Sequence, residues 1–193
     1  LWLGFMKLGE RGGAVAMLAR VFDPLMRKLF PGIPAGHAAG SSIVMNMAAN
    51  MLGLDNAATP LGLKAMKELQ TLNATPDTAS NDQILFLVIN TSAVTLIPVA
   101  IFTYRVQLGA ADPTDVFLPL LIATYCSTLA GLLATAYMQG LRLLDPVVLA
   151  YLGGLTAFVG GIVAYFTQLD RATLEAQSSL VSNVVIFMLI LSF

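Results

Sequence analysis

Residues 116–140 read VFLPLLIATYCSTLAGLLATAYMQG, a run without a charged side chain. A helix needs about 20 mostly apolar residues to cross the roughly 30 Å hydrocarbon core of a bilayer, and this run is long enough. Two further stretches, Pro146 to Phe166 and Gln83 to Tyr104, meet the same length without an internal charge. We expect Gln177 to Phe193 to belong to a fourth span. The sequence therefore predicts an all-α fold, a polytopic bundle of membrane helices.

The composition of the 193-residue chain agrees with this class and argues against others. Hydrophobic residues make up 57% and charged residues 11%, and the mean hydropathy of +0.79 lies well above that of a typical water-soluble domain. The formal charge of −1 comes without a basic stripe, so we expect no nucleic-acid partner. One cysteine and one histidine cannot supply a Cys/His cluster, so we expect no metal and no cofactor.

Catalytic patterns are missing from the sequence. The single histidine, His37, precedes every predicted span. No carboxylate stands at a spacing from it that is typical of a catalytic pair, so no Ser-His-Asp arrangement can be assembled. No phosphate-binding loop or dinucleotide fingerprint occurs either, and we expect that the chain is not an enzyme. No linker divides residues 1–193, which we interpret as a single membrane domain. Because its last apolar run has no polar stop, we expect it to be part of a longer or paired polytopic protein.

The stretch before the first span differs from the rest. Ala38 to Leu54 is uncharged and helical in pattern, but it is short and rich in Gly, Ser and Asn. Beyond it, Thr59 is a good N-cap and Pro60 a good first helical residue, which predicts that a new helix starts there. We therefore expect a broken or re-entrant helix near residues 38–60. Re-entry places eight of the ten Lys and Arg residues on one side, whereas crossing places seven on one side and three on the other. The positive-inside rule favours re-entry by this one residue, with the Lys-rich side cytoplasmic.

Helical periodicity and start signals continue after this break. Apolar residues recur at helical spacing from Leu61 to Leu72 while charged residues fall on another face, which predicts an amphipathic helix ending near residues 71–73. The box from Ser80 to Gln83 predicts the start of the following helix. Gly153, Ala157 and Gly161 form a face of small residues, which predicts close helix packing.

Polar side chains at membrane depth are the candidate site, because lipid offers them no partners. Asn46 and Asn50 continue a polar stripe that begins at Ser42, and a second group comes near the middle of the first span. Carboxamides and hydroxyls can bind a hydrophilic solute or replace part of an ion's water shell. Alternatively, they only tie neighbouring helices together. The second group is Asn90, Thr91 and Ser92, and Thr124, Cys126, Ser127 and Thr128 fall at a similar depth in the next span.

The predicted break adds backbone groups to this site. An interrupted helix at membrane depth leaves unpaired carbonyls at one end and unpaired amides at the other, which is how many transporters bind ions and anionic groups. We expect exposed carbonyls over residues 50–54 and exposed amides at Leu61 and Gly62. Asp55 is the acidic residue at the break and the candidate partner for a cation or proton. If the break lies at the interface, Asp55 is instead an ordinary loop or capping residue.

Several motifs follow one another along the chain. They are Gly9-Glu10-x-Gly12-Gly13, Leu29-Phe30-Pro31-x-x-Pro34-x-Gly36-His37, Met45-Asn46-x-x-Ala49-Asn50-Met51-Leu52-Gly53-Leu54-Asp55-Asn56-Ala57-Ala58-Thr59-Pro60, Asp77-Thr78-Ala79-Ser80-Asn81, and Phe86-Leu87-Val88-Ile89-Asn90-Thr91-Ser92. Together they resemble the spore maturation protein A family, within the wider nucleoside-recognition, or Gate, membrane domains. The resemblance covers about residues 5 to 135, and its longest motif adds Asn56 and Thr59 to the candidate site.

This resemblance implies a multipass protein of the bacterial inner membrane. Family members are often paired with, or fused to, a homologous B-type partner, and related Gate segments occur in nucleoside transporters and ferrous-iron transporters. Permeation of a small hydrophilic solute, nucleoside-like or an ion, is therefore the first functional hypothesis. The alternative is a non-transporting assembly or scaffold component in a complex with the B-type partner. In both cases the lipid bilayer is the surrounding medium.

Overall fold

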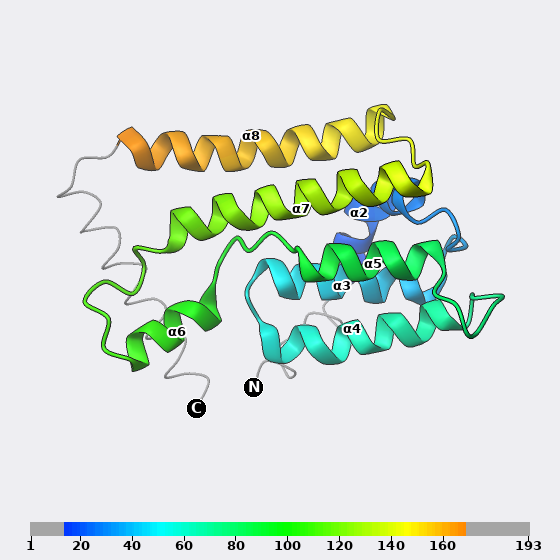
Figure 1. Cartoon of the computed structure of the whole chain (residues 1–193), viewed down its shortest axis with the longest axis horizontal. Coiled ribbons are helices and arrows are strands. Elements are labelled where there is room, and N and C mark those ends of the chain that lie inside the picture. The colour runs from blue at the N-terminus through cyan, green and yellow to red at the C-terminus, as the bar shows by residue number, and fades with distance from the viewer. Residues whose placement is uncertain (1–13, 169–193) are drawn as a thin grey trace.

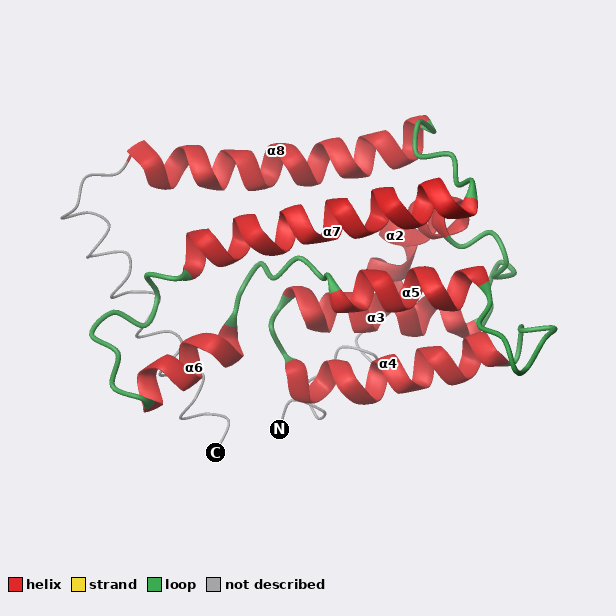
Figure 2. Cartoon of the chain, viewed as in Figure 1, coloured by secondary structure: helices red, strands yellow, loops and turns green. Residues whose placement is uncertain are grey.

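A computed structural model describes residues 14–168, without the side chains of residues 14–19, 55 and 56. This part of the chain contains seven α-helices and no strand, so the predicted all-α membrane fold is confirmed (Figures 1 and 2). The helices are α2 (Ala14–Leu29), α3 (Ala38–Met51), α4 (Asp55–Gln70), α5 (Asn81–Thr91), α6 (Val99–Gln107), α7 (Phe117–Gln139) and α8 (Pro146–Gln168).

Helices α7 and α8 are long and apolar enough to cross a membrane. Each has 23 residues, or about 35 Å at 1.5 Å per residue. A short connection joins them, and they run antiparallel at the top of Figure 1. The predicted segments 116–140 and 146–166 are therefore confirmed as helices long and apolar enough to cross a membrane. The predicted span over residues 177–193 lies outside the described residues.

The predicted continuous span from Gln83 to Tyr104 is wrong. The chain forms the 11-residue α5 and the 9-residue α6, separated by an irregular segment over residues 92–98. Pro98 explains this break, because it has no N–H to donate and disfavours helical backbone at the residue before it. The start of α5 is as predicted: the Ser80 side chain accepts from the Gln83 backbone, and the Gln83 side chain accepts from the Ser80 backbone.

Helices α3 and α4 form a tight hairpin, which confirms the predicted break near residues 38–60 but not the predicted start of the second helix. Helix α4 begins at Asp55, five residues before Pro60, and Thr59 is not its N-cap. Gly53 has a φ of +62° and reverses the chain at once, and the Leu54 carbonyl accepts from the amides of Ala57 and Ala58 at 2.9 Å each. Pro60 therefore lies within α4 and is not its first residue.

The amphipathic pattern of α4 is confirmed. Ala65 and Leu69 are fully buried, Lys64 and Lys67 are exposed, and the helix ends at Gln70 with Thr71 as its cap. By contrast, a side chain added at Gly153 or Gly161 on α8 would meet nothing within 4 Å. The close packing predicted for this face is not made by the described residues.

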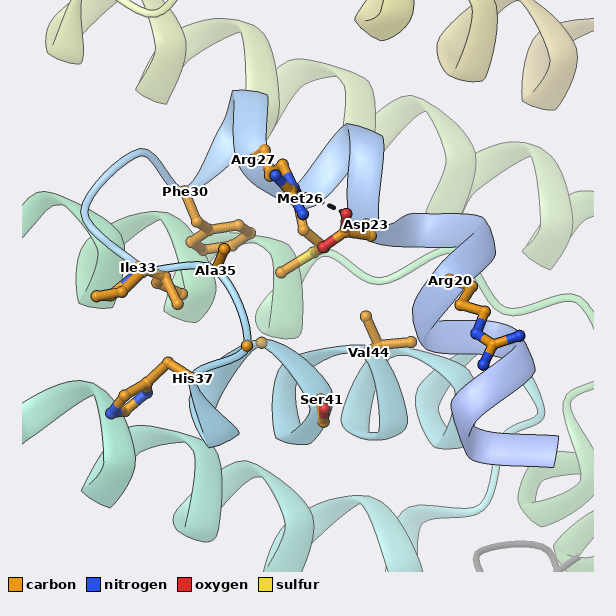
Figure 3. Close-up of a pocket in the computed structure, with 13 residues that line it drawn as sticks. Arg20, Asp23, Met26, Arg27, Phe30, Ile33, Ala35, His37, Ser41 and Val44 are labelled. Atoms are coloured by element: carbon orange, nitrogen blue, oxygen red, sulfur yellow. Dashed lines mark hydrogen bonds and ion pairs between the residues drawn. The ribbon is translucent and has the colours of Figure 1, made fainter. Parts of the chain in front are cut away.

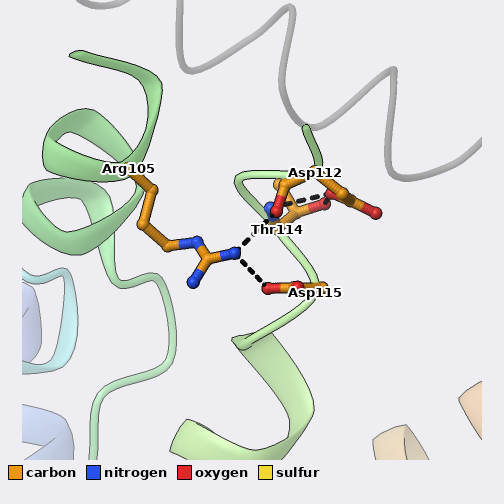
Figure 4. Close-up of polar contacts among 4 residues, drawn as sticks. All are labelled: Arg105, Asp112, Thr114 and Asp115. Atoms are coloured by element: carbon orange, nitrogen blue, oxygen red, sulfur yellow. Dashed lines mark hydrogen bonds and ion pairs between the residues drawn. The ribbon is translucent and has the colours of Figure 1, made fainter. Parts of the chain in front are cut away.

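Polar contacts hold the two ends of the bundle. At one end, Lys28 of α2 contacts Asp145 at the start of α8, with 2.8 Å between Nζ and Oδ2. That hydrogen bond lowers the pKa of the Asp145 carboxyl. At the other end, Arg105 reaches from α6 to the connection before α7 (Figure 4). Its Nη2 donates to the Asp112 carbonyl at 2.9 Å and contacts the Asp115 carboxylate at 2.7 Å, which secures the α6–α7 loop.

Candidate functional site

Three asparagine side chains meet between α3, α4 and α5. Asn46, 1% exposed, donates from Nδ2 to the Ala58 carbonyl of α4 at 2.8 Å. Asn50, one turn further along α3, donates from Nδ2 to Asn46 Oδ1 at 3.2 Å and to Asn90 Oδ1 at 2.5 Å. We call Asn46, Asn50 and Asn90 the asparagine triad. It joins two stretches that the sequence analysis had proposed separately.

A glycine on α4 makes room for the triad. A side chain at Gly62 would lie 3.0 Å from Asn46 Nδ2 and 3.2 Å from Asn90 Nδ2, tighter than ordinary contact. Gly62 is buried inside the helix, where glycine weakens helix formation. The sequence pattern predicted a role for its backbone amide alone. A glycine two residues after a helical proline was the available signal for this close approach.

The two helix breaks contact each other through the backbone. The Met51 carbonyl, at the end of α3, accepts from the amides of Leu96 at 2.8 Å and Ile97 at 3.1 Å. A side chain at Gly53 would lie 2.5 Å from the Ile97 carbonyl oxygen. The α3–α4 turn and the α5–α6 segment are therefore packed backbone to backbone.

These contacts correct the prediction of exposed backbone groups. The Asn50 carbonyl accepts from Gly53 at 2.9 Å, and the Ala49 carbonyl accepts from Leu54 at the same distance. Leu61 and Gly62 lie within α4, so their amides are not a helix start. The carbonyls of Ala49, Asn50 and Met51 are therefore paired by the turn itself and by the α5–α6 segment, because buried backbone groups must find partners.

Threonines of α7 complete the irregular segment. The Thr95 amide donates to Thr124 Oγ1 at 3.2 Å, and Thr128 Oγ1 donates to the Ser92 carbonyl. These two hydroxyls therefore replace helical hydrogen bonds that the break has removed, a structural role. Cys126 and Ser127 lie on an exposed face of α7 instead.

The contacts with α7 define the depth of the site. Thr128 is the twelfth of the 23 residues of α7, so the α5–α6 break lies beside the middle of this membrane-length helix. The α3–α4 turn contacts the same segment and therefore lies at a similar depth, as Figure 1 also shows. The interruption is not at the end of the span.

The remaining predicted residues are not part of the triad. Thr91 Oγ1 donates to the Leu87 carbonyl at 3.0 Å, and Ser92 Oγ donates to the Val88 carbonyl at 2.7 Å, both within their own helix. Thr59 is exposed on α4. The side chains of Asp55 and Asn56 lie outside the described part. Among the described residues, no group of three His, Cys, Asp or Glu side chains could hold a metal ion.

The triad leaves one acceptor and one donor for another molecule. Asn50 uses its amide nitrogen for two oxygens, and no described residue donates to its Oδ1. Asn90 accepts through Oδ1, and its Nδ2 has no partner among the described residues. Both side chains are partly exposed, unlike Asn46. A carboxamide oxygen beside a carboxamide nitrogen can pair with a neutral, hydrogen-bonding solute.

These features define a helical membrane protein with two interrupted helices meeting beside the middle of a membrane-length helix. The family model described as Gate, nucleoside recognition, matches residues 1–107 and thus ends with α6, beyond the triad and both breaks. Over 136 residues the chain is 41% identical to spore maturation protein A of Bacillus subtilis (strain 168), covering 70% of this chain and 69% of that protein. The chain belongs to this nucleoside-recognition family. No solved structure matches it significantly.

Proposed function

We propose that the protein is a permeation or transport component that passes a small hydrophilic solute, nucleoside-like or an ion, at the asparagine triad. The observation that carries this proposal is the meeting of two helix interruptions and three carboxamides at mid-span depth. Polar groups at this depth are costly, and such sites in transporters lie at broken helices. The unpaired oxygen of Asn50 and nitrogen of Asn90 supply the contacts for the solute.

The proposal also includes the membrane location and the partner of the protein. We infer a multipass protein of the bacterial inner membrane that acts with a homologous B-type membrane partner and catalyses no covalent reaction. The pairing rests on the resemblance to the spore maturation protein A family, to which the 41% identical relative from Bacillus subtilis belongs. Co-purification of the two partners from membranes tests it, and separate elution of the two proteins contradicts it.

An uptake assay tests the permeation proposal. The full-length protein is reconstituted into vesicles with its partner, and uptake of uridine, succinate and Mn²⁺ is measured for Asn50→Ala and Asn90→Ala. Each substitution removes one hydrogen bond to the solute, so we expect uptake to fall about tenfold. Asn81→Ala, at an exposed position of α5, is the matched control and should keep full uptake. Permeation is rejected if no probe moves, or if both variants fold and transport normally.

A scaffold role is the second candidate, and the mutual hydrogen bonds of the triad favour it. Asn50 donates to both other members and thereby fastens α3 to α5. If the triad only joins helices, Asn46→Ala and Asn50→Ala lower the stability of the complex in detergent without changing any flux. Loss of flux in Asn90→Ala at unchanged melting temperature contradicts this second role.

A further inference from the structure

A cavity of about 300 Å³ lies apart from the asparagine triad, between α2, the loop after it and the start of α3 (Figure 3). One part of its lining is apolar. Met26, Phe30 and Val44 are buried core residues that contribute to its wall. This wall suits hydrocarbon rather than a fully hydrated ion.

The rest of the lining carries positive charge. Arg20 and Arg27 both line the cavity, two turns apart on α2. Arg27 donates from Nε to Asp23 Oδ2 at 2.7 Å, so one negative charge offsets one of the two positive charges. Arg20 makes no ion pair within the described residues. The exposed Ser41 adds a hydroxyl to the same cavity.

Two contacts locate the cavity near the membrane surface. Lys28, next to Arg27, contacts Asp145, the residue before α8 begins. The Tyr151 hydroxyl donates to the Val21 carbonyl, next to Arg20, so this turn of α2 lies beside the second turn of α8. Arg20 therefore lies near the second turn of a membrane-length helix, and Arg27 lies at the level at which that helix leaves the hydrocarbon. Lipid phosphates lie at that level, and arginine binds phosphate strongly.

We propose that this cavity binds the headgroup of an anionic phospholipid. The lipid phosphate contacts the Arg27 guanidinium group, Arg20 adds positive charge at the other end of the lining (Figure 3), and the glycerol and upper acyl region rest against the apolar wall. A free phosphate shares the first contact but leaves the apolar wall unused. The inference is independent of the proposed permeation function, because the cavity and the triad share no residue.

Native mass spectrometry of the full-length protein in detergent tests this site. The protein is titrated with dioleoylphosphatidylglycerol, dioleoylphosphatidylcholine or inorganic phosphate. We expect one phosphatidylglycerol per chain, bound at least tenfold more tightly than phosphatidylcholine, and little competition from millimolar phosphate. Arg20→Gln with Arg27→Gln should weaken phosphatidylglycerol binding about tenfold or more, because one charge-assisted contact and a second positive charge of the lining are lost.

A second variant distinguishes lipid binding in the cavity from nonspecific attraction of the lipid to positive charge. Gly40 lines the cavity, and a β-carbon added there meets nothing within 4 Å. Gly40→Leu therefore adds bulk to the cavity without changing its charge, and leucine also favours the helix. It should also weaken binding about tenfold, at an unchanged melting temperature. Arg142→Gln, an exposed arginine outside this cavity, should bind as the wild type. Unchanged binding in Gly40→Leu, an equal loss in Arg142→Gln, or full displacement by phosphate overturns the proposal.

Discussion

At the scale of single residues, Gly53 carries the tightest constraint in the site. Its φ of +62° is left-handed, and its α-carbon faces the Ile97 carbonyl and the Val99 amide of the other break. Any side chain there meets backbone, which cannot move aside without opening the α5–α6 segment. The contact between the two interruptions therefore depends on the absence of one β-carbon.

Gly53→Ala should consequently destabilise the protein by about 2 kcal/mol or more, from left-handed backbone strain together with the clash. Thermal unfolding in detergent measures this. Gly109→Ala is the control. Gly109 has a φ of +73° but open space around it, so this substitution should destabilise the protein only through left-handed backbone strain, by about 1 kcal/mol. Equal melting temperatures for the two variants would show that the two breaks are not in contact.

A second residue-scale effect concerns Asp82 at the start of α5. Partial burial raises the pKa of its carboxyl, while a hydrogen bond with the Gly32 backbone opposes the shift. Because the folded state holds the proton more tightly, its contribution to stability is complete below the ordinary pKa and is lost as the pH rises through the raised value.

The variant Asp82→Asn should remove this slope, so its stability between about pH 4 and 7 should be flatter than that of the wild type. The effect should stay below about 1 kcal/mol, since a partly exposed charge is screened by water. Melting temperatures across this range measure it, with the exposed Asp77→Asn as control. A wild-type slope in Asp82→Asn contradicts the assignment.

At the scale of secondary-structure elements, α7 stabilises the irregular segment between α5 and α6. Helical hydrogen bonds lost at residues 92–98 are partly replaced by Thr124 and Thr128, and Gly131 allows the close approach. At Gly131, a side chain would lie 2.9 Å from Val88 Cγ1. The polar side chains of Thr124 and Thr128 on α7 therefore stabilise the break between α5 and α6.

Thr128→Val should leave the Ser92 carbonyl without its donor and destabilise the fold by about 1 kcal/mol, the usual scale for such bonds in membrane proteins. Ser127→Ala, on the exposed face of the same helix, should change nothing. Thermal unfolding of both variants in one detergent decides the matter. A larger loss in Ser127→Ala would mean that the outer face of α7 is the supporting one.

For individual helices, sequence patterns were reliable where the residues involved are neighbours in the chain. The capping box of α5 and the amphipathic face of α4 depend on residues three or four positions apart, and both are confirmed. The start of α4 and the continuity of the span through Pro98 were predicted wrongly. Gly53 and Pro98 are local causes of the two breaks, and contacts with distant segments support them, because Gly53 packs against Ile97 and Ser92 accepts from Thr128.

At the scale of the whole molecule, the α3–α4 hairpin determines the topology. Helix α3 runs from one end of the bundle toward the level of the middle of α7, and α4 returns to the same end (Figure 1). The loop at Ala35 and the loop at Thr75 should therefore lie on one side of the membrane, and Gly109 on the other. The concentration of Lys and Arg on the first side agrees with a cytoplasmic location.

Single cysteines at these exposed positions test the topology. In a Cys126→Ser background, Ala35→Cys and Thr75→Cys should react with an impermeant maleimide from the same side of sealed vesicles, and Gly109→Cys should react from the opposite side. Inverted and right-side-out vesicles provide the comparison. Labelling of Ala35→Cys and Thr75→Cys from opposite sides would mean that α3 crosses the membrane.

The sequence by itself determined the membrane class, the spans α7 and α8, the family resemblance and the asparagines of the site, because hydropathy, helical spacing and motifs are local. Only the tertiary structure decided that Asn50 meets Asn90, that the Met51 carbonyl pairs with the α5–α6 segment, and that the break lies beside the middle of α7. These features join residues about 30 to 45 positions apart. Such pairings follow from packing and from the need to satisfy every buried polar group, which no local pattern encodes.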